Sequence, residues 1–274
     1  DKAGKDVVEV YYNPPYTDGG IEKASKNLAG FEKTKELQPG ESQKVTVKFD
    51  DDDMASYDYK GAKAYVLEKG DYDISIQSDS HHVIDHKAIT VKDTVTYDSD
   101  SNTHNGDKTV ATNQFDDVAG DVTYLSRADH FANYKEATAA PTNFKMSDKA
   151  KETFYNNSNY DPKKFDKDSD KMPTTGAKNG LKLSDMYGKD YDDADWDKLL
   201  DQLTFDDMDN LIANGGYGTQ AVKSVGKIQL TDADGPASLN NNFTGVGSIG
   251  FPASTAFACT WNKDLAKQFG EMIG

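Results

Sequence analysis

Cysteine is almost absent from this chain. The only one, Cys259, stands among 274 residues, so no disulfide can form within the chain. It lies in a run of small and apolar residues (AFACT), and no histidine is near it in sequence to activate it as a nucleophile. We therefore predict a thiol that is packed in the core.

Long apolar runs and an excess of positive charge are also missing. No window approaches the roughly 18 apolar residues of a membrane span. Lysine and arginine number 31 against 47 acidic residues, which gives a net charge of -16. Such a charge repels phosphate backbones and anionic lipid. We expect no membrane span in this chain and no nucleic-acid partner.

The N-terminal part of the chain has the pattern of a β-protein. Turn signals such as Pro39-Gly40 and Lys69-Gly70-Asp71 separate short stretches that alternate or run apolar. No helix of convincing length interrupts them. We predict strands at residues 7–12, 44–49, 64–67, 72–77 and 86–91. Strands at this spacing predict an antiparallel β-sandwich over residues 1–95.

The same segment resembles the fibronectin type III-like domain that accompanies the catalytic barrel of glycoside hydrolase family 3. The resemblance rests on VVEVYYNPPY, NLAGFEKTKELQPGESQKVTVKFDDDDMASYD and YVLEKGDYDISIQSDS. In such a domain Leu28 and Phe31 would plug the core, and Gly70 would allow a tight turn. A sandwich of this type has one or two strands before VVEVYY. We expect these strands to be missing here, which would bare a sheet edge.

Metal ligands are suggested at three places. His81, His82 and His86 are close in sequence, and imidazoles can share one ion, but no Cys or acidic partner has a convincing spacing. Residues 98–102 and 166–170 echo the first ligand positions of a calcium loop and lack its Gly and Glu. We predict a solvated turn at the histidines and no metal site. A surface calcium ion stays open as an alternative.

Residues 96–192 differ from what precedes them. They are rich in Asp, Asn, Lys, Ser, Thr and Tyr and show little periodicity. Their aromatic residues are too frequent for a mere spacer, so we predict an ordered, irregular connector that docks on a partner domain by its rings. Residues 147–155 are its best candidate for a helix, with Ser147 as the N-cap.

Two helices are predicted next, at residues 195–202 and 205–213. Thr204 offers its hydroxyl to the N-terminus of the second helix, and Gly215-Gly216 ends it. The apolar faces of the pair are supplied by Leu199, Leu200, Leu203, Met208, Leu211 and Ile212.

The most informative stretch is residues 228–274, and its centre is Asp234-Gly235-Pro236. We interpret residues 227–231 as a short buried strand, 232–236 as the turn that leaves it, and 261–273 as an amphipathic helix. In a parallel α/β architecture the loop after a strand collects ligand-contacting residues, so Asp234 is placed to hydrogen-bond a polar substrate. The structural alternative is that Asp234 only caps a turn, because Asp-Gly is an ordinary turn pair.

This stretch closely resembles the opening of the catalytic barrel of glycoside hydrolase family 3, whose best-known members are β-glucosidases. The resemblance covers DGPASL and FPASTAFACTWNKDLAKQFGEMIG, and LLDQLTFDDMDNLIANGG resembles the helix pair that leads into the barrel. In that family the Asp of DGP binds hydroxyls of the sugar in the subsite where cleavage occurs. The resemblance gives this substrate-binding role to Asp234. It also implies that residues 193–274 begin a (β/α)8-type barrel.

The order of the segments resembles a permuted arrangement found in some bacterial members of the family. It implies a longer chain that runs α/β sandwich domain, fibronectin-like domain, connector and barrel. The resemblance implies a retaining, exo-acting β-glycosidase that hydrolyses terminal β-linked sugars, most simply a β-glucosidase. Its partners are a β-linked oligosaccharide or glycoside, the rest of the barrel and the α/β sandwich domain, and no cofactor is implied.

The catalytic carboxylates of the family are not found in this sequence. The family nucleophile is an Asp in an SDW-like motif late in the barrel, and the acid/base is usually a Glu of the sandwich domain. No SDW occurs here, so we name no catalytic residue and expect the 274-residue chain to be inactive alone. The expected fold is mixed: a β-sandwich, an irregular connector and an incomplete barrel.

Two other interpretations stay open. The chain could be a non-catalytic carbohydrate-binding or cell-surface β-sandwich, which a flat row of exposed Trp or Tyr would favour; the sandwich has Tyr and no Trp. It could also be a scaffold that positions other domains. The sugar, the linkage and the oligomeric state are open. The acidic composition, almost free of Cys and rich in Tyr and Asn, favours a secreted or surface-attached bacterial protein over a cytosolic one.

Overall fold

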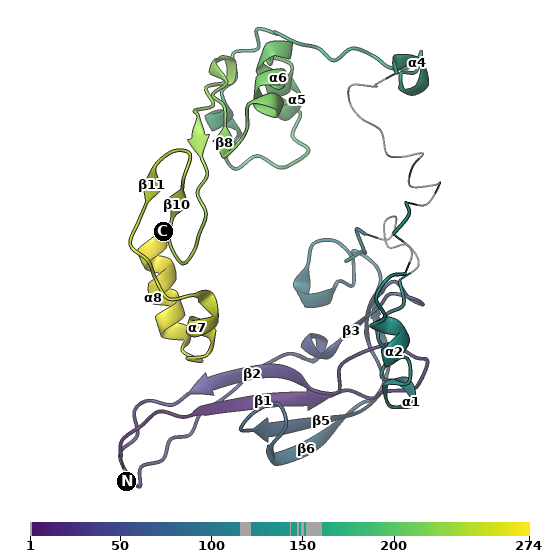
Figure 1. Cartoon of the computed structure of the whole chain (residues 1–274), viewed down its shortest axis with the longest axis vertical. Coiled ribbons are helices and arrows are strands. Elements are labelled where there is room, and N and C mark those ends of the chain that lie inside the picture. The colour runs from purple at the N-terminus through teal and green to yellow at the C-terminus, as the bar shows by residue number, and fades with distance from the viewer. Residues whose placement is uncertain (1, 116–121, 143, 147, 149–150, 152–160) are drawn as a thin grey trace. The chain divides into compact units, whose positions relative to one another are not determined.

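The computed structural model describes residues 2–115, 122–142, 144–146, 148, 151 and 161–274 (Figure 1). Its contacts divide the chain into two units. The first comprises Asp1–Phe144 and Phe257–Met272, and the second comprises Lys145–Ala256 and Ile273–Gly274. Each unit has its own buried apolar cluster.

The first unit contains two antiparallel sheets, as the strand pattern predicted. One sheet has the order β2-β1-β5-β6 (Figure 1), and the other has the order β3-β4-β7. The strands are β1 (Val7–Asn13), β2 (Asn27–Lys33), β3 (Ser56–Asp58), β4 (Ala64–Leu67), β5 (Gly70–Gln77), β6 (Val83–Val91) and β7 (Val95–Tyr97). Every ladder in these sheets is antiparallel. The antiparallel β class is therefore confirmed.

The core of the first unit is built from few but large side chains. Tyr12, Met54, Leu67 and Tyr72 form its buried cluster, and Met54, at the end of the short helix η1 (Asp51–Met54), is 0% exposed. Burying a side chain of this size contributes about 1.5–3 kcal/mol. The Tyr12 hydroxyl donates to the Asp53 carbonyl (3.2 Å) and the Tyr72 hydroxyl to the Glu68 carbonyl (3.1 Å). Burial raises the pKa of Tyr72 to about 12, so the phenol stays a neutral donor.

The strand predicted at residues 44–49 does not form a ladder. Val45, Val47 and Phe49 are half-buried and alternate with exposed residues, as in a strand. The Cγ1 atom of Val47 lies 2.7 Å from the place that a Cβ on Gly30 would take, so the segment packs over β2. However, its backbone bonds to no strand in the described part of the chain. The prediction is wrong here because alternation fixes which face is buried, whereas a ladder also needs a neighbouring strand.

Strand β2 was not predicted, because NLAGFEK has no clear alternation. Its Leu28 is 43% exposed, so the expectation that Leu28 plugs the core is wrong. The ring of Phe31 instead meets the ring of Trp261 edge-on, with 4.9 Å between centroids. Lys263 donates to the Phe31 carbonyl (2.9 Å) and pairs with Glu32 (2.7 Å). The residues around Trp261 are thus packed on the edge strand of the larger sheet.

Residues 126 and 127 of the connector dock on the sandwich through polar contacts. Glu22 accepts hydrogen bonds from the Ser126 hydroxyl (2.7 Å) and the Arg127 N–H (3.0 Å). The Arg127 guanidinium donates to the Lys23 carbonyl and lies 4.2 Å from the centre of the Tyr16 ring. Several aromatic rings of the connector are exposed in this chain: Phe115, Tyr124, Phe131, Tyr134, Phe144, Tyr187 and Tyr191. Docking of these rings on a partner domain stays a prediction.

Short helices follow along the connector. Their bounds are η2 (His104–Gly106), α1 (Ala128–Phe131), α2 (Tyr134–Ala137), α4 (Pro162–Phe165) and η4 (Leu183–Met186). The helix predicted at residues 147–155 falls almost wholly outside the described residues. No helix in the described part of the chain is long and apolar enough to cross a membrane.

The second unit is centred on the predicted helix pair, α5 (Asp195–Leu200) and α6 (Phe205–Ala213). Its buried cluster is Met186, Leu199, Leu203, Val222 and Val225, the last from η5 (Lys223–Val225). Two residues predicted to be apolar contacts, Leu200 and Ile212, are exposed. Each helix is so short that only one narrow face meets the cluster.

The beginning of the predicted barrel takes another form. The predicted buried strand is reduced to β9 (Leu230–Thr231), which is exposed and pairs antiparallel with β8 (Gly218–Thr219). A second antiparallel pair joins β10 (Asn240–Asn241) to β11 (Val246–Gly247). A strand of a parallel barrel is buried because other elements cover both of its faces. Both residues of β9 are exposed, so nothing in the described part of the chain covers β9 in this way. The barrel is therefore not confirmed.

Two helices end the chain, α7 (Ser254–Ala258) and α8 (Lys263–Ile273). The prediction of a helix at residues 261–273 is confirmed with a later start, because the side chain of Asn262 accepts from the Leu265 N–H (3.1 Å) and caps the helix. Helix α7 was not predicted. Cys259 is exposed just after it, so the prediction of a packed core thiol is wrong.

Candidate functional site

The loop that carries Asp234 is closed by its own backbone. The Asp234 N–H donates to the Asn240 carbonyl (2.8 Å), and the Asn240 N–H donates to the Asp234 carbonyl (3.0 Å). Asn241, only 4% exposed, donates from its amide to the Asp232 carbonyl (2.7 Å). The amide oxygen of Asn241 accepts from the N–H groups of Phe243 (2.9 Å) and Thr244 (3.1 Å). The side chain of Asn241 therefore holds both ends of the loop.

The carboxylate of Asp234 is left outside this framework. Asp234 is exposed, and its side chain makes no hydrogen bond or ion pair with any other described residue. The turn-cap alternative requires the carboxylate to accept from a nearby backbone N–H, and no such bond is present within the described loop. An ionised carboxylate is a hydrogen-bond acceptor only. It is therefore available to accept bonds from hydroxyl donors.

An aromatic pair flanks the same loop. The rings of Tyr217 and Phe243 are stacked, with 5.1 Å between centroids, and Phe243 is 81% exposed. The pair belongs to the loop framework, because the Asp232 N–H donates to the Tyr217 carbonyl (3.0 Å) and the Phe243 N–H donates to Asn241. Neither ring was predicted from the sequence to belong to the site. The single aromatic residue in the polar run NNNFT was the available signal.

The suggested metal ligands do not come together. His82 pairs with Asp79 (2.7 Å), and His86 pairs with Asp73 (2.8 Å), each at an exposed place. In the residues that the structure describes, including 98–102 and 166–170, no group of three or more His, Cys, Asp or Glu side chains is placed to hold a metal ion.

The similarity to known proteins extends over both units of the chain. Residues 6–80 match the family of fibronectin type III-like domains. Beta-glucosidase A of Butyrivibrio fibrisolvens is 30% identical over 293 residues, which cover 97% of this chain and 32% of the relative. The beta-glucosidase of Ruminococcus albus is 28% identical over 296 residues, which cover 99% of this chain and 27% of that relative. This chain is similar to β-glucosidases.

The resemblance to family 3 β-glucosidases that the motifs indicated is thus confirmed. A beta-glucosidase structure from Paenibacillus barengoltzii shares the fold, with a TM-score of 0.56 at 20% identity over 97% of this chain and 28% of that chain. The β-glucosidase-like chain spans between 27% and 32% of the length of the curated relatives it matches.

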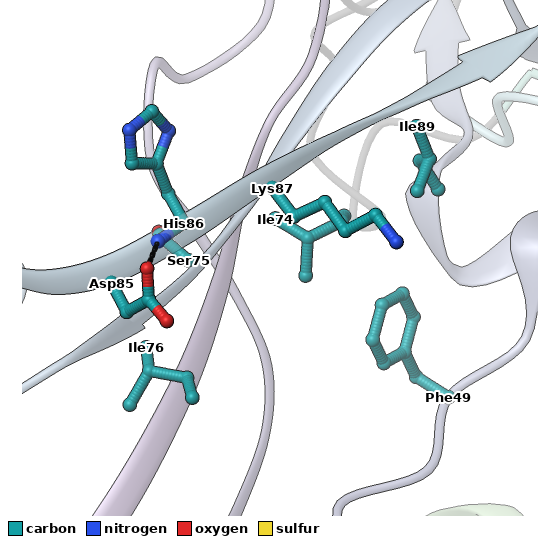
Figure 2. Close-up of a pocket in the computed structure, with 8 residues that line it drawn as sticks. All are labelled: Phe49, Ile74, Ser75, Ile76, Asp85, His86, Lys87 and Ile89. Atoms are coloured by element: carbon teal, nitrogen blue, oxygen red, sulfur yellow. Dashed lines mark hydrogen bonds between the residues drawn. The ribbon is translucent and has the colours of Figure 1, made fainter.

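An apolar hollow in the sandwich of this β-glucosidase-like chain differs in kind from the Asp234 loop. A hollow of about 370 Å³ lies among Phe49, Ile74 and Ile89. Figure 2 shows the ring of His86 on the far side of the β6 ribbon from Phe49. Small-molecule sites combine apolar walls with a few polar groups that converge on the ligand. Here Ser75, Asp85, His86 and Lys87 also line the hollow, but the surface that the lining presents to it is mostly apolar. The hollow is the unfilled side of the sandwich core beside residues 44–49.

Proposed function

We propose that this chain is part of a retaining, exo-acting β-glycosidase, most simply a β-glucosidase, in which Asp234 binds the sugar. The observation that carries the proposal is the continuous similarity to Beta-glucosidase A over 97% of the chain, which includes the DGP segment. The exposed carboxylate on a loop closed by its own hydrogen bonds supports the role of Asp234.

In the proposed enzyme the segments have separate tasks. Residues 1–95 are the fibronectin-like sandwich, 96–192 are the connector, and 193–274 begin the catalytic barrel. The rest of the barrel and an α/β sandwich domain would complete the active site. The match of residues 6–80 to fibronectin type III-like domains supports the first of these assignments. The composition favours a secreted or surface-attached location.

The proposed reaction uses two carboxylates from outside this chain. One attacks the anomeric carbon and displaces the leaving oxygen, which the other protonates; the second then deprotonates the water that releases the sugar. Asp234 accepts hydrogen bonds from hydroxyls of the terminal sugar and fixes the ring for attack. Charge-assisted bonds of this kind are about twice as strong as neutral ones. No cofactor takes part in this chemistry.

The role of Asp234 is tested by Asp234→Ala in the longer enzyme, assayed with an aryl β-glucoside. Losing hydrogen bonds to a charged group costs about 1.5–3 kcal/mol. We expect kcat/KM to fall by roughly 10- to 150-fold. The matched control is Asp232→Ala, which removes an exposed carboxylate of the same loop and retains the backbone bonds. Equal losses in the two variants, or no loss in Asp234→Ala, would overturn the assignment.

A further inference from the structure

A second hollow in the first unit has a different lining from the apolar one. It has a volume of about 450 Å³ and lies between the β3–β4 ladder and a stretch of the connector. Its lining consists of Tyr57, Tyr59, Tyr65, Ala111, Thr112, Asn113, Gln114 and Phe115. Small-molecule sites have volumes of about 300–1,000 Å³ and combine aromatic walls with a few polar groups. This hollow meets both criteria.

The tyrosine rings of the hollow are held in place by their neighbours. Tyr57 and Tyr65 are direct partners in the β3–β4 ladder, and their rings meet edge-on at 5.4 Å. Tyr65 is stacked on His104 with 3.9 Å between centroids, and His104 Nε2 is 2.9 Å from the Asp52 carbonyl. Tyr59 packs edge-on against Tyr124 at 5.4 Å. Rings fixed in this way lose little conformational entropy when a ligand binds.

The opposite wall supplies amides and one exposed ring. The Gln114 amide donates to the Thr112 hydroxyl (2.7 Å), and the side chain of Asn113 accepts from the Phe115 N–H (3.0 Å). These side chains carry both donors and acceptors. The Phe115 ring is 71% exposed, so a large apolar face is offered to a ligand. None of the side chains that line the hollow is charged.

We propose that this tyrosine hollow binds a neutral sugar unit of a β-linked oligosaccharide. A sugar ring has an apolar face of C–H groups and an edge of hydroxyls, which matches aromatic walls with amides beside them. The uncharged lining offers no counter-ion to phosphate or to an acidic sugar. The site is built from residues other than those of the Asp234 loop. Only the choice of β-linked glucose as the sugar rests on the proposed function.

The test is a titration of the 274-residue chain with cellotetraose, followed by calorimetry and by NMR shifts. We expect saturable binding, with maltotetraose, its α-linked counterpart, at least tenfold weaker. Phe115→Ala and Gln114→Ala remove exposed side chains on the connector wall, so the sandwich stays folded. Each substitution should lower the affinity for cellotetraose at least fivefold. The matched control is Tyr187→Ala, because Tyr187 is 97% exposed and lines no part of the hollow.

Three results would overturn the proposal. The first is an absence of saturable cellotetraose binding at tens of millimolar. The second is equal weakening by Tyr187→Ala. The third is binding that Asp234→Ala abolishes and Phe115→Ala leaves unchanged, because this would assign the sugar to the Asp234 loop. Asp234→Ala should leave cellotetraose binding intact, so the two sites can fail independently.

Discussion

At some positions a single added carbon atom would collide with a neighbouring side chain. Gly30 of β2 faces the extended segment at residues 44–49, and a Cβ on it would lie 2.7 Å from Val47 Cγ1. Real Cβ contacts are longer, and the branched valine side chain is stiff. Gly30 is therefore what lets the segment approach the sheet, in the absence of a hydrogen-bonded ladder between the two.

We expect Gly30→Ala to destabilise the sandwich. Overpacking of this kind costs about 1–3 kcal/mol, which urea unfolding of the 274-residue chain measures as a lower midpoint. The control is Gly247→Ala, since a Cβ on Gly247 meets nothing within 4 Å. An unchanged midpoint in Gly30→Ala would contradict the packing of Val47 on β2.

Asp195, the first residue of α5, provides a prediction about pH. Lys189 (2.6 Å) and Lys198 (2.8 Å) both donate to its carboxylate, and these hydrogen bonds lower its pKa from 3.8 to about 2. A pKa that is lower in the folded state stabilises the fold above about pH 4, and this contribution is lost as the pH falls toward 2. At pH 7 the wild-type chain should therefore have a higher Tm than Asp195→Asn. The difference in Tm should shrink by pH 2. An equal difference at both pH values would contradict a stabilising role of the ionised Asp195 carboxylate.

Some helices and strands are specified mainly by residues within or next to them, and helix α6 is one of these. Helix α6 begins at the residue after Thr204, where the Asp207 N–H donates to the Thr204 hydroxyl (3.1 Å) and the Thr204 N–H donates to the Asp207 carboxylate (3.0 Å). This reciprocal capping satisfies two backbone donors that would otherwise lack partners at the helix start. The helix is thus fixed at its N-terminus by two residues three positions apart in the chain.

Thr204→Ala should weaken the second unit by about 1 kcal/mol, the usual cost of removing such a cap. The measurement is the urea midpoint followed by helical circular dichroism. Thr231→Ala is the matched control, because Thr231 is exposed and lies in the two-residue strand β9. A midpoint that moves equally in both variants would show that the cap contributes nothing specific.

The predictions from sequence succeeded where structure is local. The bounds of α6 and β4 were predicted as observed, since caps, turns and alternation lie within each segment. Residues 44–49 and β9 differ from the strands predicted for them, because a ladder depends on a partner far away in the sequence. For the candidate sites, the DGP motif indicated Asp234, whereas the tyrosine hollow brings together three strand-and-loop tyrosines and a connector segment. Such convergence is a property of the fold and leaves no pattern in the sequence.

The whole molecule combines a β-rich unit with a unit that holds the Asp234 loop. The chain covers about a third or less of its β-glucosidase relatives. A glycosidase needs two carboxylates on opposite sides of the scissile bond, and the proposed assignment puts both in other parts of the enzyme. We therefore propose that this chain contributes sugar binding and architecture, and that catalysis requires carboxylates outside these 274 residues.

The most direct test measures hydrolysis of an aryl β-glucoside by the 274-residue chain and by the longer polypeptide that contains it, at equal molar concentration. We predict turnover by the longer polypeptide and none above background by the chain alone. Activity of the chain alone would mean that its own carboxylates suffice for catalysis. An inactive longer polypeptide would mean that the similarity to β-glucosidases is not accompanied by their chemistry.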